Sequence, residues 1–262
     1  MNLDLKTKNA LVCGSTQGIG KASAMELAKL GANVTLLARN EDSLKKVKAE
    51  LPNNGSQLHS YLCADFSNPK QLEELVNAFV RRNGPVHILV NNTGGPPAGP
   101  IVKARTEEFV TAFSNHLICN HILAQACIEG MKNTGYGRII NVISTSVKQA
   151  LPNLGVSNTI RAAVGNWAKT MANELAEFGI TVNNVLPGAT ATQRLSAILE
   201  NKAQKNNTST DAVKHEMLHE IPMKRFAEAA EIANAVAFLA SPAAAYITGI
   251  NLPVDGGRTS SL

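Results

Sequence analysis

Short apolar runs of strand length alternate along the chain with longer segments whose apolar residues recur at helical spacing. Strands and helices in this order are typical of a parallel sheet with helices on its faces. The expected strands cover residues 9–13, 33–38, 58–63, 87–91, 138–144, 180–187 and 250–255. The expected helices cover residues 19–30, 42–51, 70–82, 106–131, 154–178 and 229–240. The alternation therefore predicts an α/β fold in which helices connect parallel strands.

Nothing in this alternation marks a boundary between domains. The 262 residues contain no proline- or glycine-rich linker, no internal repeat and no low-complexity tract. We therefore expect a single-domain Rossmann fold over residues 1–262, with a doubly wound, seven-stranded parallel sheet and helices on both faces. Residues 189–225 break the rhythm with a polar stretch at 201–211. This segment is interpreted as a lid of short helices over a cleft, and a surface insertion fits equally well.

The composition is that of a globular chain, with 44% hydrophobic and 17% charged residues. The formal net charge of +5 arises from basic residues interleaved with acidic ones, and 4% of the residues are aromatic. Nucleic-acid binding needs a basic patch and stacking side chains, so no nucleic-acid partner is expected, whereas a phosphate-bearing ligand would account for the charge. Because no apolar run has the length of a signal peptide or membrane span, we expect a cytoplasmic location and no membrane partner.

Four cysteines stand inside apolar segments, namely Cys13, Cys63, Cys119 and Cys127. They show no Cys-x-x-Cys spacing and have no histidine at metal-ligand spacing. Buried thiols are therefore predicted at all four positions, and no metal site is expected.

A glycine-rich turn follows the first expected strand and precedes the first expected helix. It consists of Gly14, Ser15, Thr16, Gln17, Gly18, Ile19 and Gly20. A backbone that approaches a pyrophosphate closely, and aims free amide groups at it, needs glycines in such a turn. The same residues could form a plain tight connection, but the order of strand, turn and helix favours dinucleotide binding.

The second expected strand ends at Arg39, and no acidic residue stands at its tip. An acid there would bind the ribose hydroxyls of NAD, whereas an arginine can pair with the 2′-phosphate of NADP. NADP(H) is therefore preferred as cofactor over NAD(H). The alternative is a solvated arginine in front of a helix that Asn40 caps.

Further motifs, together with this turn, resemble the short-chain dehydrogenase/reductase family over nearly the whole chain. They are Asp65, Asn91-Asn92-Thr93-Gly94, Asn115, GRIINVIS ending at Ser144, ITVNNVLPG with Pro187 and Gly188, and AYITGINLPVDGG. The 3-oxoacyl-acyl-carrier-protein reductases look like the nearest familiar branch. The resemblance implies cofactor contacts for the turn residues and for Arg39, Asp65, Asn91, Thr93, Gly94, Arg161, Pro187 and Gly188. Thr93 and Cys13 replace the family's usual alanine and threonine, and both are small enough for the cofactor groove.

The catalytic helix departs from the family pattern of a serine followed by Tyr-x-x-x-Lys. Ser144 matches the serine, but Ser157 stands at the tyrosine position and Arg161 at the lysine position. Residues four apart share one helix face, so both can point into the cofactor cleft. A serine alcohol is a far weaker acid than a phenol, and losing a positioned general acid typically costs on the order of 10²- to 10⁴-fold in rate.

The other parts of the resemblance still imply a working site. Arg161 can donate hydrogen bonds to the nicotinamide ribose and stabilise a developing alkoxide, although it cannot release a proton. Ser144 would hold a substrate carbonyl, and Asn115 would anchor a water molecule. A water, Lys148 or His116 could replace the missing acid, with a structural role the better interpretation for His116. Tyr61, Tyr136 and Tyr246 fall outside the catalytic helix and are predicted to be structural.

Two hypotheses follow from this mixture of kept and lost residues. The first is an NADP(H)-dependent oxidoreductase that acts on a small-molecule carbonyl or hydroxyl substrate, with 3-oxoacyl compounds as one candidate class. The second is a catalytically impaired dinucleotide-binding or sensing protein. In either case the resemblance implies a homodimer or homotetramer, formed through segments 106–131 and 154–178.

Overall fold

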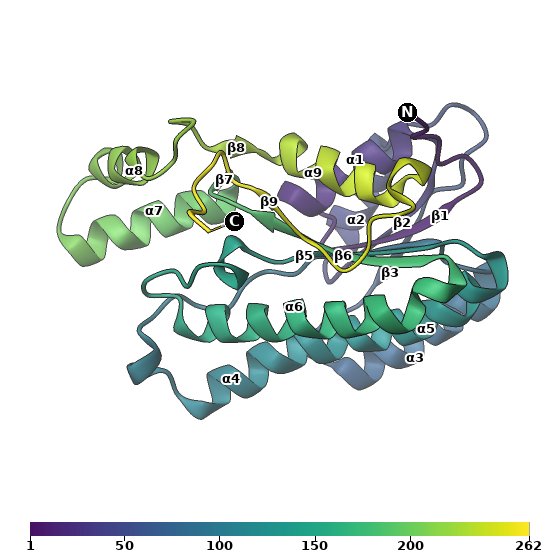
Figure 1. Ribbon diagram of the computed structural model, residues 1–262, viewed down its shortest axis with the longest axis horizontal. Helices are drawn as coiled ribbons and strands as arrows, with labels where there is room; N and C mark the ends of the chain where they lie inside the picture. Colours follow the sequence, from purple (N-terminus) through teal and green to yellow (C-terminus); the bar gives the residue numbers. More distant parts are fainter. Residues whose placement is uncertain (262) are drawn as a thin grey trace.

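A parallel sheet of seven strands forms the middle layer of the computed structural model, which describes residues 1–261 (Figure 1). Its strands are β1 (Asn9–Cys13), β2 (Asn33–Ala38), β3 (Ser60–Cys63), β4 (Ile88–Asn91), β5 (Gly137–Val142), β6 (Ile180–Pro187) and β9 (Asn251–Val254). They are arranged in the order β3-β2-β1-β4-β5-β6-β9, and every neighbouring pair is parallel. The predicted fold class is confirmed.

Helices cover both faces of this sheet (Figure 1). One face carries α1 (Gly18–Lys29), α2 (Glu41–Glu50) and α9 (Ala229–Ala240). The other carries α3 (Pro69–Asn83), α5 (Cys119–Thr134) and α6 (Gly155–Leu175). Short 3₁₀ helices are η1 (Ile101–Lys103), η3 (Thr145–Val147), η4 (Ala176–Phe178) and η5 (Pro242–Ala244).

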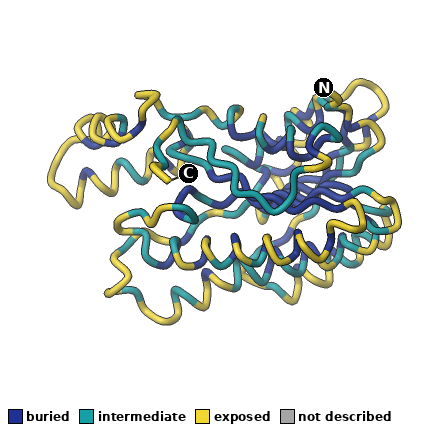
Figure 2. Tube along the Cα trace, viewed as in Figure 1, coloured by how far each residue is buried: buried dark blue, intermediate teal, exposed yellow. Residues whose placement is uncertain are grey.

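The alternation of side chains along the strands divides the core in two. In β1, Ala10 and Val12 pack with α1 and α9, whereas Leu11 and Cys13 pack with the helices of the opposite face. This is the two-residue period of a strand that is buried on both sides. Figure 2 shows the result as dark, buried strands between helices that are exposed on their outer sides. The carboxyl ends of the strands are thereby held firmly at one edge.

The helix expected over residues 106–131 is interrupted. It consists of α4 (Thr106–Phe113), a π-helical turn η2 (Ser114–Ile118) and then α5. A π turn inserts an extra residue into the helical repeat, which rotates the side chains that follow, and such turns are frequent at functional sites. Here the turn carries Asn115 and His116, and it was not predicted from the apolar spacing.

Residues 189–225 contain two helices, α7 (Gln193–Asn206) and α8 (Thr210–His219). Two short paired strands, β7 (Thr190–Ala191) and β8 (Ala227–Glu228), lie at the ends of this segment. The helices bury a small apolar cluster of their own, formed by Leu195, Ala203, Val213 and Met217. They project beyond the carboxyl ends of the strands (Figure 1), which is the place a lid would need. Movement of this segment stays a prediction.

The prediction of four buried thiols is wrong for Cys63. Its residue is exposed because β3 is an edge strand, and its Sγ–H donates to the carbonyl oxygen of Arg39 at 3.5 Å. The other three cysteines are buried, and burial raises the pKa of Cys119 and of Cys127 to about 12. Those thiols are therefore packing groups rather than nucleophiles.

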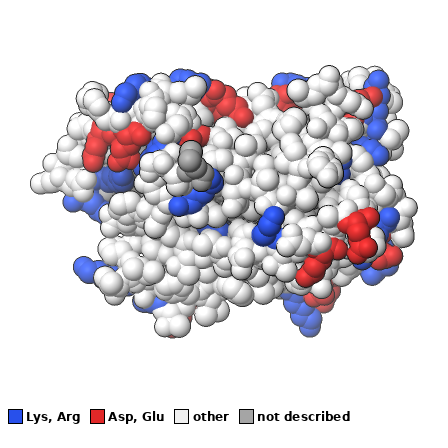
Figure 3. Space-filling view, in the orientation of Figure 1, with Lys and Arg blue, Asp and Glu red and all other residues white. Residues whose placement is uncertain are grey.

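The described residues were compared with what membrane insertion, metal binding and nucleic-acid binding would each require. Among residues 1–261, no helix combines the length and the apolar character needed to cross a membrane. The same residues include no group of three or more histidine, cysteine or acidic side chains placed to hold a metal ion. On the face in Figure 3, basic and acidic side chains occur in separate small groups rather than as one basic surface. Nucleic-acid binding and cellular location stay untested.

Candidate active site

The strand order reverses between β1 and β4, and ligands of open α/β sheets bind in the crevice at such a point. The glycine turn follows β1 directly, and Asn92 follows β4. The two segments touch, because Asn92 Nδ2 donates to the carbonyl oxygens of Cys13 at 3.2 Å and Gly14 at 3.4 Å. Asn92 was not among the predicted site residues, although its place in the Asn-Asn-Thr-Gly motif could have singled it out.

The close backbone packing of the glycine turn depends on Gly14 and Gly20, which have no side chain. Gly14 has a φ of +59°, and a Cβ atom there would lie 2.6 Å from the carbonyl oxygen of Asn92. A Cβ on Gly20 would collide with the carbonyl oxygen of Gly14. Gln17 at the N-cap of α1 makes no side-chain capping bond, so the first-turn amides are left for another acceptor. This cradle fits the phosphates of a dinucleotide.

The remaining residues of the turn differ in how far they are buried. Ser15 is buried, and its hydroxyl donates to the carbonyl oxygen of Leu37 at 3.4 Å, which ties the turn to β2. Thr16, Gly18 and Ile19 are half-buried, and Gln17 is exposed. The turn is therefore attached to β2 through Ser15, while Gln17 is exposed to solvent.

Arg39 and Asp65 stand at the carboxyl ends of neighbouring strands β2 and β3. Arg39 is exposed, and within residues 1–261 it forms no ion pair. Asn40 does cap α2, since its Oδ1 accepts from Ser43 N at 2.8 Å. Asp65 is half-buried and accepts from Ser67 N at 2.9 Å. Both residues therefore lie at the same end of the strands as the glycine turn, the carboxyl end.

Asn91 faces the inside of the sheet and heads a row of four asparagines. Its Nδ2 donates to Asn141 Oδ1 at 2.9 Å, Asn141 donates to Asn184 at 2.9 Å, and Asn184 donates to Asn251 at 2.8 Å. These residues are register partners on β4, β5, β6 and β9. The buried Oδ1 of Asn91 has no partner within the described residues. Its predicted contact with the cofactor stays a prediction.

Ser157 and Arg161 lie on one face of α6 and are both buried, with 8% and 7% of their surfaces exposed. Arg161 Nη1 donates to the carbonyl oxygen of Val142 at 3.3 Å, at the end of β5. Two residues further on, Ser144 Oγ accepts from Ser146 N at 3.1 Å, which leaves its own proton free to donate. Burial, and next the charge of Arg194, lowers the pKa of Arg161 to about 10, so the guanidinium stays charged at neutral pH.

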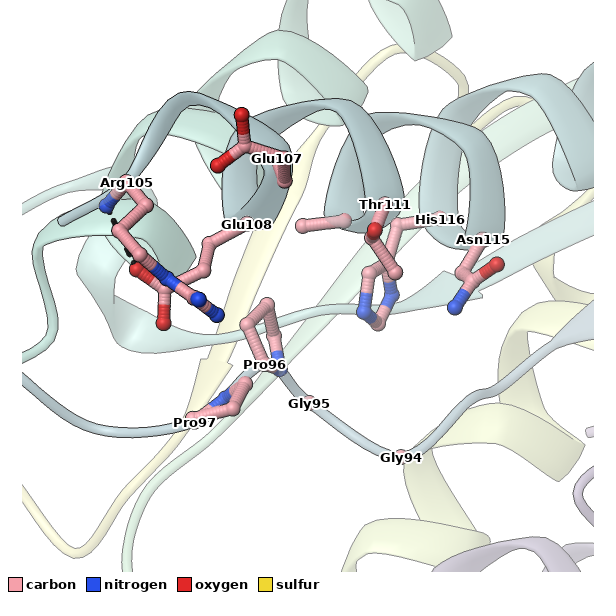
Figure 4. A pocket seen from close by; sticks show the side chains of 11 residues that line it. Gly94, Gly95, Pro96, Pro97, Arg105, Glu107, Glu108, Thr111, Asn115 and His116 are labelled. Carbon is pink, nitrogen blue, oxygen red and sulfur yellow. Dashed lines mark hydrogen bonds between the residues drawn. The ribbon is translucent and has the colours of Figure 1, made fainter. Parts of the chain in front are cut away.

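Asn115 and His116 extend from the π turn toward the loop at Gly94 and Gly95 (Figure 4). His116 is buried, and its Nδ1 lies 2.5 Å from Thr93 Oγ1. Burial, followed by the charges of Arg161 and Arg194, lowers the pKa of His116 to about 3. The imidazole is therefore neutral at pH 7 and cannot act as a cationic acid, which agrees with its structural interpretation. Lys148 is half-buried after η3, and its role stays untested.

A pocket of about 310 Å³ opens between this loop and α4 (Figure 4). Its lining consists of Gly94, Gly95, Pro96, Pro97, Arg105, Glu107, Glu108, Thr111, Ala112, Asn115 and His116. The outer end is charged, and the carboxylate of Glu108 accepts from the backbone of Arg105 at 2.7 Å. The inner end is formed by the π turn. The pocket is thus bounded on one side by the loop after β4 and on the other by α4 and the π turn, and Asn115 is the predicted catalytic residue that it contains.

Arg194, near the start of α7, is a site residue that the sequence reasoning missed. Its Nη1 donates to the carbonyl oxygen of Gly95 at 3.1 Å and its Nη2 to that of Pro96 at 3.4 Å. It thereby joins the 189–225 segment to the loop after β4. No motif around Arg194 could have revealed this, because the contact spans almost a hundred residues.

The last predicted cofactor residues close the crevice beside β9. Pro187 ends β6, and Gly188 N donates to the carbonyl oxygen of Val254 at 2.9 Å. A Cβ on Gly188 would lie 2.7 Å from Asp255 Cα, so this close approach requires glycine. The tyrosines lie elsewhere: Tyr61 bonds to Glu41 and Tyr136 to the carbonyl oxygen of Ala240, while Tyr246 is fully exposed.

Known proteins resemble this chain along nearly its whole length. A family profile described as "Enoyl-(Acyl carrier protein) reductase" matches residues 14–259. The 3-oxoacyl-[acyl-carrier-protein] reductase FabG of Vibrio cholerae is 37% identical over 257 residues, which cover 97% of this chain and 98% of that protein. The NADPH-dependent reductase BacG of Bacillus subtilis is 30% identical over 259 residues, which cover 98% and 100%.

A solved structure gives the same result in three dimensions. The L-sorbose reductase of Gluconobacter frateurii, crystallised with NADPH and L-sorbose, superposes with a TM-score of 0.92 at 30% identity and full coverage of both chains. Since sequence and structure agree over nearly every residue, the chain belongs to the short-chain dehydrogenase/reductase family.

Proposed function

We propose that this protein is an NADP(H)-dependent oxidoreductase that interconverts a carbonyl and a hydroxyl group on a small molecule. The observation that carries the proposal is the convergence of the glycine cradle, Ser144 and Arg161 at one edge of the sheet. The relatives described as NADPH-dependent or crystallised with NADPH support the same activity. When NADPH is bound, it supplies the hydride.

Each side chain of the site has a distinct task in this reaction. The hydroxyl of Ser144 donates to the substrate oxygen, because the bond that it accepts from Ser146 N leaves its own proton free. Arg161 orients the nicotinamide ribose and offsets negative charge that develops on the substrate oxygen. Asn115 anchors a water at the π turn. Ser157 lines the site without serving as an effective acid, so the proton has to come from solvent through such a water.

The proposal is tested by following NADPH oxidation at 340 nm with ketones, aldehydes and 3-oxoacyl thioesters. We expect slow but saturable turnover with at least one compound class, and binding of NADPH in the micromolar range. Tight NADPH binding without oxidation of any substrate would instead support the alternative, a dinucleotide-binding or sensing protein. That alternative draws its support from the serine at position 157.

The preference for NADP(H) rests on Arg39, which is exposed at the tip of β2 without an acidic neighbour in ion-pair contact. We expect Arg39→Ala to raise the Kd for NADPH by about 10- to 100-fold, because charge-assisted bonds to the 2′-phosphate are lost. The Kd for NADH should not change. Lys48→Ala removes another exposed cation from α2 and serves as control. Equal losses for both cofactors would assign Arg39 to the common part of the dinucleotide.

We also propose a homo-oligomer in which α4 and α6 contact a second copy of the chain. A nearly uncharged apolar hollow of about 450 Å³ lies on this side, lined by Phe109, Val110, Phe113, Ser114, Ile118 and Ile160. Val110 is 64% exposed and Phe113 41% exposed, which is unusual for neighbouring apolar side chains on a monomer. A two-fold axis at this surface would bring the same apolar side chains of both copies into contact.

Val110→Asp is expected to convert the oligomer to monomers at micromolar concentration, because a carboxylate would be buried unpaired at the contact. Light scattering after size-exclusion chromatography gives the mass. Leu58→Asp, at a position that is 81% exposed outside the α4–α6 surface, should leave the mass unchanged. A monomeric native protein would overturn the proposed assembly.

A further inference from the structure

Two arginines from distant elements converge on Gly95. A Cβ atom on this glycine would lie 2.5 Å from Arg194 Nη2 and 3.4 Å from Arg161 Nη2. Arg194 comes from α7 and Arg161 from α6, and both side chains reach the loop after β4 at Gly95. The missing side chain of Gly95 is what allows both guanidinium groups to approach. Two like charges are thus held close together without a side chain between them.

Neither arginine has a counter-charge. Within residues 1–261, no carboxylate lies in ion-pair contact with Arg161 or Arg194, and their recorded acceptors are backbone carbonyls. Arg161 is 7% exposed, and its Nε has no partner in the described structure. A buried charge and an unsatisfied donor are both costly, so a site that keeps them is suited to an anion that supplies the missing partners.

The surrounding side chains do not neutralise this charge. His116 is neutral and bonded to Thr93. The nearby acids of the pocket, Glu107 and Glu108, belong to the first turn of α4, and Glu108 already accepts from the Arg105 backbone. Guanidinium groups match carboxylates in shape and hydrogen-bonding pattern, whereas carbonyls satisfy one donor each. The local chemistry therefore selects an oxyanion.

We propose that Arg194, assisted by the charge of Arg161, binds a carboxylate of the substrate beside Gly95, so that the enzyme acts on oxo acids or hydroxy acids. Arg161 has five N–H donors, so it can face this carboxylate and still bond to the nicotinamide ribose. This inference rests on the proposed oxidoreductase function and specifies its substrate class. A cofactor phosphate presents similar oxygens, but the glycine turn after β1 already provides a separate cradle for those groups. Because Arg194 belongs to α7, the anion would also fasten the 189–225 segment over the bound substrate.

The test compares acids with their neutral esters on the NADP⁺-saturated protein. Isothermal titration would measure binding of 2-, 3- and 4-oxo acids of three to eight carbons and of the corresponding methyl esters. In the native protein, at least one acid should bind tenfold or more tightly than its ester. In Arg194→Ala this preference should fall below about threefold, while Arg194→Lys keeps part of it. Lys202→Ala, an exposed cation on the same helix, should keep all of it.

Two outcomes would overturn the inference. The first is that no acid in the series is preferred over its ester. The second is that the preference survives in Arg194→Ala, and a tenfold rise of the Kd for NADPH in that variant would then assign the anion site to the cofactor. Because binding is measured without turnover, a protein that prefers acids but oxidises no NADPH would refute the proposed catalysis and leave the carboxylate site standing.

Discussion

Introducing Ser157→Tyr together with Arg161→Lys is expected to raise kcat for reduction of a neutral ketone by about 10²- to 10⁴-fold. Both positions lie on the buried face of α6, and Arg161 bonds to the carbonyl oxygen of Val142, two residues before Ser144. We therefore expect a phenol at 157 to lie close to the hydroxyl of Ser144. A neighbouring ammonium lowers the pKa of a phenol toward neutrality, and a positioned general acid supplies an acceleration of this size. Steady-state NADPH oxidation with methyl acetoacetate would measure it.

The matched control is Ser157→Phe with the same Arg161→Lys change. It has the bulk of the aromatic ring but no proton to give, so its kcat should stay at the native level. If both double variants gain equally, the effect comes from packing or from the lysine, and the proton-donor explanation fails. A native protein that already matches the tyrosine variant would mean that another group acts as the acid.

Gly20→Ala should raise the Kd for NADPH by at least about 100-fold, or roughly 2.7 kcal/mol. The added Cβ would collide with the carbonyl oxygen of Gly14 and lie 2.7 Å from Asn92 Nδ2. Backbone cannot yield as the end of a flexible side chain can, so the turn has to open and its amides lose their aim at the phosphates. Quenching of intrinsic fluorescence on NADPH addition gives the Kd, and circular dichroism checks that the fold is retained.

Gly99→Ala is the control for this change, because nothing lies within 4 Å of a Cβ at that position. Its NADPH affinity should stay within about threefold of the native value. A folded Gly20→Ala protein with native affinity would show that the dinucleotide does not use this turn.

The sheet could be predicted closely because its signal is local. In β1 and β6 the apolar runs coincide with the observed strands at both ends. The glycine turn could be predicted equally well, because a backbone that packs this closely requires glycine and the glycines are visible in the sequence. The expected strand at 58–63 begins two residues later, at Ser60, and Leu58 is 81% exposed. An edge position, which no local pattern records, explains both that difference and the exposure of Cys63.

The parts that escaped prediction depend on contacts between distant segments. The π turn keeps the apolar content of a regular helix, so the spacing of residues 106–131 gave no sign of it. The bond between Thr93 and His116 joins a residue that departs from the family pattern with a histidine 23 positions away, and no local pattern predicts that contact. Arg194 stands in a polar segment without a motif, and its importance comes from the carbonyls of Gly95 and Pro96. The role of each of these residues depends on contacts that form only in the folded chain.

The row of asparagines across β4, β5, β6 and β9 fixes the register of the strands that carry the candidate active site. All three bonds run in one direction, from the amide nitrogen of one residue to the amide oxygen of the next. If one strand slipped by one residue, its asparagine would turn to the other face of the sheet. Two buried amide groups would then lose their hydrogen-bond partners. Ser144 follows Asn141 by three positions, and Pro187 follows Asn184 by three. By fixing the register of β5 and β6, the row of asparagines therefore fixes where Ser144 and Pro187 lie relative to each other at the carboxyl ends of these strands.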